Sequence, residues 1–423
     1  MTTENDAHRA IEAVWRIEAP RLVAGLTRLT RDISMAEELA QDALLVALKQ
    51  WPETGVPQKA GAWLMTTAKR RAIDYFRRNK MAARKLDELG ADMQTEQDFG
   101  GDDPDARLDD HIGDDLLRLI FTSCHPILSM ESRVALTLRL IGGLTTDEIA
   151  RACLVPEPTV AQRIVRAKKT ISESRIPYEV PRGADMAERL SSVLGVIYLI
   201  FNEGYSATAG EDWMRPQLCS DALRLGRVLA ELAPGEPEVH GLVALMEIQA
   251  SRQPARTARD GTPILLLEQD RSRWDWTLVR RGLAALDRAE ALGRRTGTYQ
   301  LQAAIAACHG RARRAEDTDW HRIADLYDQL AAVAPSPVVD LNRAVAYGLA
   351  FGPQAGLDLA DTLADDPTLA GYHLLPSVRG DFLFKLGRLD EARAEFERAA
   401  GMTRNEREIA FLRGRADASA VRN

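Results

Sequence analysis

Apolar side chains recur at helical spacing along the long segments of this chain. Over 34–51 they fall on one face of a helix with a period of about 3.6 residues. Ser34, with Glu37 three residues later, predicts a capping box at the start of this helix, and Pro52 predicts its end. The same periodicity predicts a second helix over about 59–80. The pattern as a whole predicts an all-α fold.

One stretch breaks the helical pattern. Residues 90–110 hold few apolar side chains and many Gly, Asp and Gln residues, which predicts a solvated, flexible linker. Helical patterns resume at Leu116 and continue to about Ser174, and Pro177 and Pro181 then mark a boundary.

The segment 144–171 predicts two short helices joined by a tight turn. Thr145 with Glu148 predicts a capping box for the first helix, and Pro158 suits the first turn of the second. The inward positions of the second helix are Val160, Ile164, Ala167 and Ile171. Its other face carries side chains that can reach base edges and phosphates in a major groove: Thr159, Gln162, Arg163, Arg166, Lys168 and Lys169. This pattern is typical of a helix-turn-helix. A plain amphipathic hairpin with a solvated basic face is the alternative, because Leu154 stands in the turn where Gly is usual.

A second basic helix is expected over 61–80, where cations alternate with aromatic rings. Such a surface suits nucleic acid whose bases are unstacked, since cations follow the phosphates and rings offer stacking platforms. Its members are Trp63, Lys69, Arg70, Arg71, Tyr75, Phe76, Arg77, Arg78 and Lys80. A solvated charge run with Trp63 and Phe76 in the core would give the same composition.

From Ala184 onward the chain is rich in Ala, Leu and Arg and remains helical. Residues 387–400 place Gly, Ala and Phe as a tetratricopeptide hairpin does, and Tyr327 and Phe396 lie two repeat lengths of about 34 residues apart. We therefore expect helical hairpins. An irregular helical bundle is the alternative, because the segment between these positions matches the repeat poorly.

Length and composition limit the protein class. The chain has 423 residues, of which 45% are hydrophobic and 28% charged, so we expect a folded protein of two or three domains. Its longest apolar run, 193–201, is too short to cross a bilayer, and the polar N-terminus does not resemble a signal peptide. Four scattered cysteines form no C-x-x-C pair, which argues against disulfides and zinc. A cytoplasmic location without membrane contact is expected.

The net charge of −7 hides a block arrangement. Residues 1–85 hold 15 Lys and Arg against 10 Asp and Glu, whereas 86–115 hold one base against 12 acids. Residues 116–175 are basic again, with 9 bases against 5 acids, and the remainder is acidic. Two basic segments joined by an acidic connector indicate a nucleic-acid partner for the first part of the chain.

No spacing in the acidic remainder supports catalysis. Glu203 or Asp270 as a general base would need a partner among His240, His309 and His321, yet metalloprotease, nucleophile-elbow and phosphate-loop motifs are all missing from the sequence. We expect no enzyme, no cofactor and no metal. Arg271 and Arg273 are instead expected to pair with acids where helices meet.

Together these segments resemble the two conserved regions of an extracytoplasmic-function (ECF) RNA polymerase sigma factor. The likeness covers about 8–175 and is carried by AEELAQDALLVALKQW (36–51), GAWLMTTAKRRAIDYFRR (61–78) and GLTTDEIARACLVPEPTVAQRIVRAKKTI (143–171). The rest resembles the sigma subgroup with a C-terminal tetratricopeptide-like domain, through YLIFNEGYSAT (198–208), LEQDRSRWDW (267–276) and SPVVDLNRAVA (336–346).

The resemblance implies a role for each segment. The first helix would bind the clamp coiled coil of the largest subunit of RNA polymerase through Glu37, Glu38, Leu39, Gln41 and Asp42. The basic helix would bind the melted −10 element and capture a flipped base through Trp63, Lys69, Arg70, Arg71, Asp74, Tyr75, Arg77 and Arg78. The helix-turn-helix would read the −35 element. Acids in the first turns of a helix also stabilise it through the macrodipole, so a purely structural role for each acid is the alternative.

The resemblance also divides the chain. We expect sigma region 2 over 1–85, an acidic linker over 86–110, region 4 over 111–176 and a regulatory domain over 184–423. The linker would occupy the RNA exit path, although repulsion of promoter DNA is a simpler expectation. The regulatory domain would contact the sigma domains in cis, or receive a signal from a ligand or partner. A helix-turn-helix regulator with a sensor domain, acting without polymerase, is the alternative function.

Overall fold

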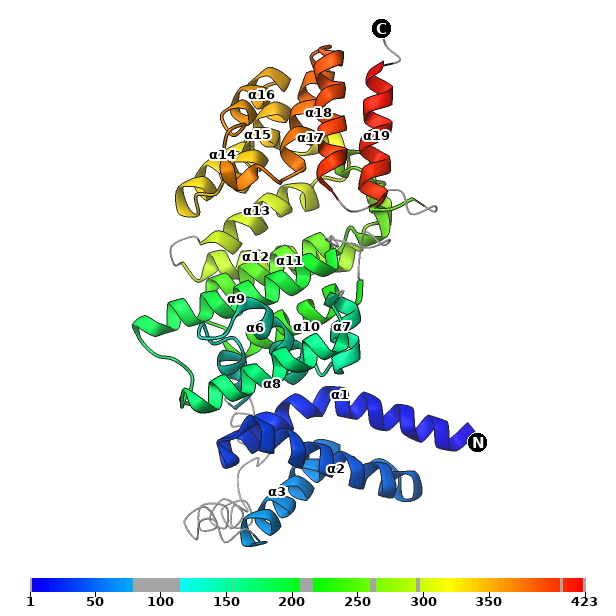
Figure 1. The fold of residues 1–423 in the computed structure, drawn as a ribbon, viewed down its shortest axis with the longest axis vertical. Helices are drawn as coiled ribbons and strands as arrows, with labels where there is room; N and C mark the ends of the chain where they lie inside the picture. Colours follow the sequence, from blue (N-terminus) through cyan, green and yellow to red (C-terminus); the bar gives the residue numbers. More distant parts are fainter. Residues whose placement is uncertain are drawn as a thin grey trace. The chain divides into compact units, whose positions relative to one another are not determined.

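The computed structural model describes residues 2–78, 115–153, 155–205, 216–258, 264–293, 297–403 and 406–420, and the expected linker over 86–110 lies outside them. The described residues form α-helices and short 3-10 helices in two compact units, Met1–Ile197 and Tyr198–Asn423 (Figure 1). The all-α prediction is confirmed.

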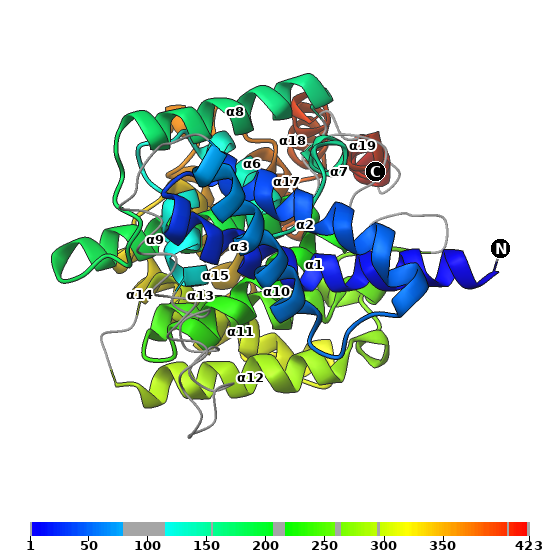
Figure 2. The same cartoon turned by 90° about the horizontal axis from the view of Figure 1, so that it is seen from below.

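The first unit contains two helical bundles. The first bundle comprises α1 (Thr2–Thr30), α2 (Ile33–Thr54) and α3 (Ala60–Arg78), which pack on one another (Figure 2). The second comprises a helix over 115–123, α6 (Met130–Leu140), α7 (Thr146–Cys153), α8 (Glu157–Glu173) and the first part of α9 (Ala184–Tyr205).

The ends of α2 differ from the prediction. Asp32, not Ser34, is the N-cap, because its carboxylate accepts the backbone N–H groups of Ser34 at 2.8 Å and Met35 at 3.1 Å. The helix also continues past Pro52 to Thr54. It ends at Gly55, whose φ of 80° suits glycine and whose N–H donates to the carbonyl of Trp51 at 2.9 Å.

The helix-turn-helix forms as predicted. The Thr145 N–H donates to the carboxylate of Glu148 at 2.7 Å, and the Glu148 N–H donates to the Thr145 hydroxyl at 3.2 Å, which confirms the capping box. The predicted inward side chains of α8 are all buried: Val160, Ile164, Ala167 and Ile171. Pro158 lies in the first turn of α8.

The second bundle extends beyond the expected boundary at residue 176. In α9, Arg189 donates to the carbonyl of Phe121 at 2.8 Å. Ser192 donates to the carbonyl of Cys124 at 2.6 Å and accepts from Arg133 at 2.7 Å. These bonds tie the start of α9 to the elements before α7, and α9 then continues into the second unit.

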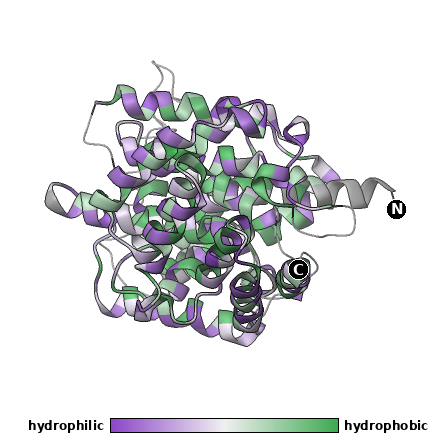
Figure 3. Ribbon diagram, turned by 90° about the horizontal axis from the view of Figure 1, so that it is seen from above, coloured by the Kyte–Doolittle hydropathy of each residue, from purple (hydrophilic) through white to green (hydrophobic). Residues whose placement is uncertain are grey.

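The second unit is built from successive packed helices. They are α10 (Pro216–Leu232), α11 (Pro237–Ala250), α12 (Trp276–Ala291), α13 (Thr298–Arg311), α14 (Trp320–Val333), α15 (Pro337–Ala350), α16 (Pro353–Asp361), α17 (Leu374–Lys385), α18 (Leu389–Met402) and α19 (Glu406–Ala420). Hydrophobic and hydrophilic residues are interspersed along the helical ribbons of the molecule (Figure 3).

Glycine allows close packing late in this unit. A Cβ at Gly380 of α17 would lie 2.9 Å from the ring of Phe396 in α18, and one at Gly348 of α15 would lie 2.3 Å from the ring of Phe382. Phe382 and Phe396 belong to one buried cluster. These rings therefore pack where a neighbouring helix has no side chain.

Candidate nucleic-acid interface

A groove of about 770 Å³ lies between α2 and α3 in the first bundle. Its lining includes side chains predicted to bind polymerase (Glu38, Leu39 and Asp42) and side chains predicted to bind the −10 element (Trp63, Arg70, Arg71, Asp74 and Tyr75). Met35, Val46, Gln50 and Thr67 complete the lining. The groove thus brings the acidic face of α2 and the basic-aromatic face of α3 to one surface.

Charge and aromatic rings shape this groove. Arg71 of α3 forms an ion pair with Asp42 of α2 at 3.3 Å, and these side chains are 47% and 40% exposed. Trp63 packs edge-on against the buried ring of Trp51, with 5.2 Å between the ring centroids. Tyr75, which is 42% exposed, remains open to solvent. A planar group could stack on such rings while the arginine binds a phosphate.

The predicted polymerase-binding residues divide into two sets. Glu38 and Gln41 are exposed and Asp42 is half-buried, so these three share the outer face of α2. Leu39 and Glu37 are buried. Leu39 lies on the apolar face of α2 that packs into the bundle, although it also reaches the floor of the groove. Leu39 therefore does not share the outer face of α2 with Glu38, Gln41 and Asp42.

Glu37 contacts the second bundle instead. Its Oε1 accepts from Arg139 Nε of α6 at 3.2 Å, and its Oε2 forms an ion pair with Lys168 Nζ of α8. Lys168, expected to contact DNA, is therefore turned inward in this arrangement. One carboxylate predicted for polymerase and one cation predicted for DNA neutralise each other.

The predicted −10 residues are also divided by burial. Arg70, Arg71, Asp74 and Tyr75 are exposed, and Trp63 is half-buried at the groove. Lys69 is only 7% exposed. It therefore does not share the open surface of the other residues predicted to bind the −10 element. The side chains of Arg77 and Arg78 lie outside the described part of the structure.

The outer face of α8 carries the remaining predicted −35 residues. Gln162, Arg166 and Lys169 are exposed, whereas Thr159 and Arg163 are half-buried. Lys169 pairs with Glu173 one turn later at 3.6 Å, and both are about two-thirds exposed, so this pair is weak. The helix therefore presents hydrogen-bonding and cationic groups along one open face.

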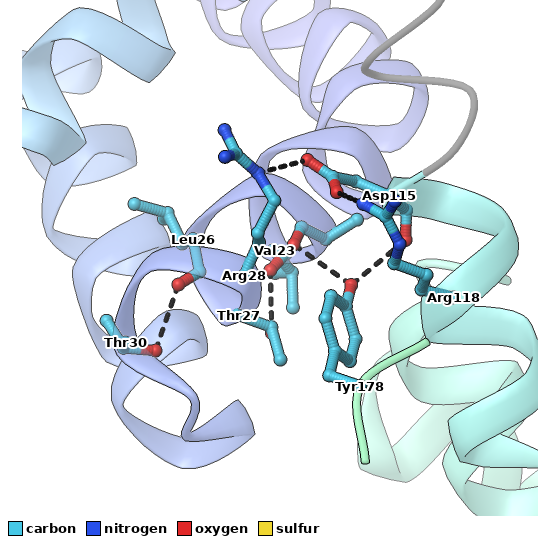
Figure 4. Close-up of polar contacts among 9 residues, drawn as sticks. Val23, Leu26, Thr27, Arg28, Thr30, Asp115, Arg118 and Tyr178 are labelled. Carbon is cyan, nitrogen blue, oxygen red and sulfur yellow. Dashed lines mark hydrogen bonds and ion pairs between the residues drawn. The ribbon is translucent and has the colours of Figure 1, made fainter. Parts of the chain in front are cut away.

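A second contact joins the two bundles of the first unit (Figure 4). Arg28 of α1 pairs with Asp115 at 3.0 Å, and Arg118 pairs with the other oxygen of that carboxylate at 2.5 Å. The Tyr178 hydroxyl hydrogen-bonds to the carbonyls of Ala24 and Asp115, each at 2.9 Å. Burial raises the pKa of Asp115, while the two arginines oppose that rise. The sequence analysis missed this contact because no local pattern links its members.

The second unit shows no catalytic arrangement among the residues that the structure describes. No group of three or more potential metal ligands occurs there. Asp270 caps a short turn by accepting the N–H of Ser272 at 2.9 Å. Arg271 is buried and donates to the carbonyls of His309 and Ala312 and to the hydroxyl of Thr318. Neutral oxygens thus replace the acidic partners expected for Arg271.

Comparison with known proteins identifies the first unit. Residues 15–81 match the family Sigma-70 region 2, and residues 118–171 match Sigma-70, region 4. A probable ECF RNA polymerase sigma factor of Mycobacterium tuberculosis, SigI, is 27% identical over 173 residues, which cover 41% of this chain and 58% of SigI. The ECF sigma factor SigK of a Mycobacterium species is 29% identical over 163 residues, covering 37% of this chain and 77% of SigK. The first unit thus carries regions 2 and 4 of an ECF RNA polymerase sigma factor.

The remainder of this sigma factor has its own relatives. Residues 189–290 match a family of unknown function, DUF6596. An uncharacterized protein of Rhizobium meliloti is 43% identical over 400 residues, covering 94% of this chain and 93% of the relative. That relative therefore shares the combination of sigma regions and C-terminal domain.

Membership in this family sets the general function. The sigma factor directs transcription initiation with core RNA polymerase and promoter DNA as partners, and it is not an enzyme. A helix-turn-helix regulator that works without polymerase is thereby set aside. None of the helices that the structure describes is long and apolar enough to span a bilayer.

Proposed function

We propose that the outer face of α2 binds the clamp coiled coil of the largest polymerase subunit. Glu38, Gln41 and Asp42 share this face, and a row of acids and amides suits a basic partner helix. Glu37 joins them only after its ion pairs with Arg139 and Lys168 have opened. We call the arrangement with these ion pairs formed closed and the arrangement without them open. The polymerase-binding surface is thus smaller in the closed arrangement than in the open one.

The groove between α2 and α3 takes the melted −10 strand. This proposal rests on one observation: Trp63, Tyr75, Arg70 and Arg71 line a single cavity of about 770 Å³. That volume accommodates an unstacked base, and the arginines lie where a backbone phosphate would follow. Asp42 pairs with Arg71 in the free protein, so a phosphate would have to replace it.

The exposed face of α8 reads the −35 element in the major groove. Gln162, Arg166 and the half-buried Arg163 can contact base edges, and Lys169 can contact phosphate. Arg163→Ala should change sequence preference, whereas Lys169→Ala should lower affinity evenly and reduce the salt slope by about one unit. Equal effects of the two substitutions would refute the proposal that this face of α8 points into the major groove.

Residues 184–423 form a tetratricopeptide-like domain that regulates the sigma regions in cis. The glycine–phenylalanine packing of α15, α17 and α18 supports this repeat class. The cis role is supported by α9, a single helix whose start belongs to the first unit and whose end belongs to the second. The proposed limits are 1–85 for region 2, 86–110 for the acidic linker and 111–176 for region 4, with the start of α9 packed on region 4.

Transcription in vitro with core polymerase tests these assignments. The full chain should initiate at its promoter, and Trp63→Ala with Tyr75→Ala should abolish opening while leaving duplex binding intact. A chain of residues 1–197 keeps the α9 segment that holds the second bundle. Altered initiation by this shorter chain would support regulation in cis, and unchanged initiation would remove it.

A further inference from the structure

An apolar side chain is exposed on α8 at the edge of the predicted DNA-reading face. Val165 of α8 is 64% exposed, although the other branched aliphatic side chains of this helix, Val160, Ile164 and Ile171, are buried. On the helix surface its neighbours are Gln162, three residues earlier, and Lys169, four residues later. Core packing therefore does not account for the valine at this position.

The major groove offers one apolar feature for such a side chain. Thymine carries a C5-methyl group at the groove edge, whereas the other base edges there present hydrogen-bond donors and acceptors. Valine has two methyl groups on a stiff, single-torsion side chain, so it loses little freedom when it packs. A valine between a glutamine and a lysine suits an edge where a methyl group is flanked by polar groups and phosphate.

We propose that Val165 is a specificity residue that selects a thymine in the −35 element by contact with its C5-methyl group. This inference rests on the proposed −35 role of α8. The contact removes from water apolar surface equal to about one methyl group in total, which corresponds to about a fourfold preference for thymine. Gln162 and Arg166 would read adjacent base pairs by hydrogen bonding.

The experiment removes the contacting methyl groups either from thymine or from Val165. Holoenzyme made with the full-length protein first selects its −35 element from a randomised duplex. Each selected thymine is then replaced by deoxyuridine, which lacks only the C5-methyl group. Binding is compared for the wild type, Val165→Ala, and Val338→Ala as a control for an exposed valine in the second unit. Because Val165 is exposed and alanine favours helices, Val165→Ala should fold normally.

The inference predicts one thymine at which deoxyuridine weakens wild-type binding about fourfold. Val165→Ala should weaken binding to the thymine duplex by a similar factor and lose sensitivity to deoxyuridine at that position, while Val338→Ala should keep it. The inference is overturned if no thymine is selected or sensitive, or if sensitivity persists in Val165→Ala. Failure of the proposed function is a separate result: Arg163→Ala and Lys169→Ala would then leave −35 binding unchanged.

Discussion

Replacing Glu37 by glutamine should open the contact between the two bundles of the first unit. The substitution keeps the size of the side chain and removes the charge that Arg139 and Lys168 share. Two unit charges at about 4 Å attract by about 4 kcal/mol in an effective dielectric of about 20. Arg139 and Lys168 are 26% and 19% exposed, so solvent reduces this value, and we expect a net loss of about 2 kcal/mol.

Such a loss corresponds to a change of about 30-fold in the equilibrium between closed and open arrangements. Amide hydrogen exchange of the full chain measures this opening directly, and exchange should increase in α2 and α8. Glu38→Gln, one residue away on the exposed face, is the matched control and should leave exchange unchanged. Adding Lys168→Gln to Glu37→Gln should produce little further opening, because both remove the same ion pair.

Binding to core polymerase gives the functional readout. If the closed contact competes with polymerase, Lys168→Gln should strengthen binding, because it opens the contact without touching the predicted polymerase face. Glu37→Gln should strengthen binding less, since Glu37 also belongs to that face in the open arrangement. Equal exchange in Glu37→Gln and Glu38→Gln, together with unchanged polymerase binding by Lys168→Gln, would refute this reasoning.

Three further predictions concern stability. Burial, followed by the charges of nearby arginines, lowers the pKa of His309 to about 3. Between about pH 6.5 and pH 3 the unfolded chain therefore binds one more proton at this residue than the folded chain does. As the pH falls through this range, the free energy of urea unfolding should decrease by about 1.4 kcal/mol per pH unit, and His309→Gln should reduce that slope. Arg271→Gln leaves buried carbonyls without their donor and should cost about 3 kcal/mol in the same assay, whereas Arg273→Gln, at an exposed position, should cost less than about 0.5 kcal/mol. A chain of residues 1–183 should unfold at lower urea than one of residues 1–197, because it lacks the α9 hydrogen bonds to the second bundle; equal midpoints would contradict that role.

Local patterns in the sequence were sufficient to predict the helices and one face of the recognition helix. The inward positions of α8 follow from apolar spacing, and the Thr145–Glu148 capping box follows from its two residue types. The start of α2 was missed because two residues close together, Asp32 and Ser34, can both cap a helix. The residue that caps the helix is the one whose backbone is extended just before the first turn. In α2 that residue is Asp32.

Partners distant in sequence could not be predicted in this way. Glu37 and Arg139 are 102 positions apart, and nothing in either local pattern indicates the pairing. Arg271 was expected to bind acids, but it binds backbone carbonyls, which every residue carries and no motif marks. Side-chain contacts could therefore not be predicted where two helical bundles or a loop and a helix meet.

The position of Glu37 changes how the acidic face of α2 can be interpreted. A carboxylate that is buried against Arg139 and Lys168 cannot bind a polymerase helix at the same time. Lys168 is likewise unavailable to DNA while it neutralises Glu37. Under the proposed roles of Glu37 and Lys168, polymerase binding and −35 reading are coupled through one ion pair, because freeing Glu37 for the first partner also frees Lys168 for the second. A sigma factor built in this way would expose its full DNA-binding charge only when it engages the enzyme that uses it.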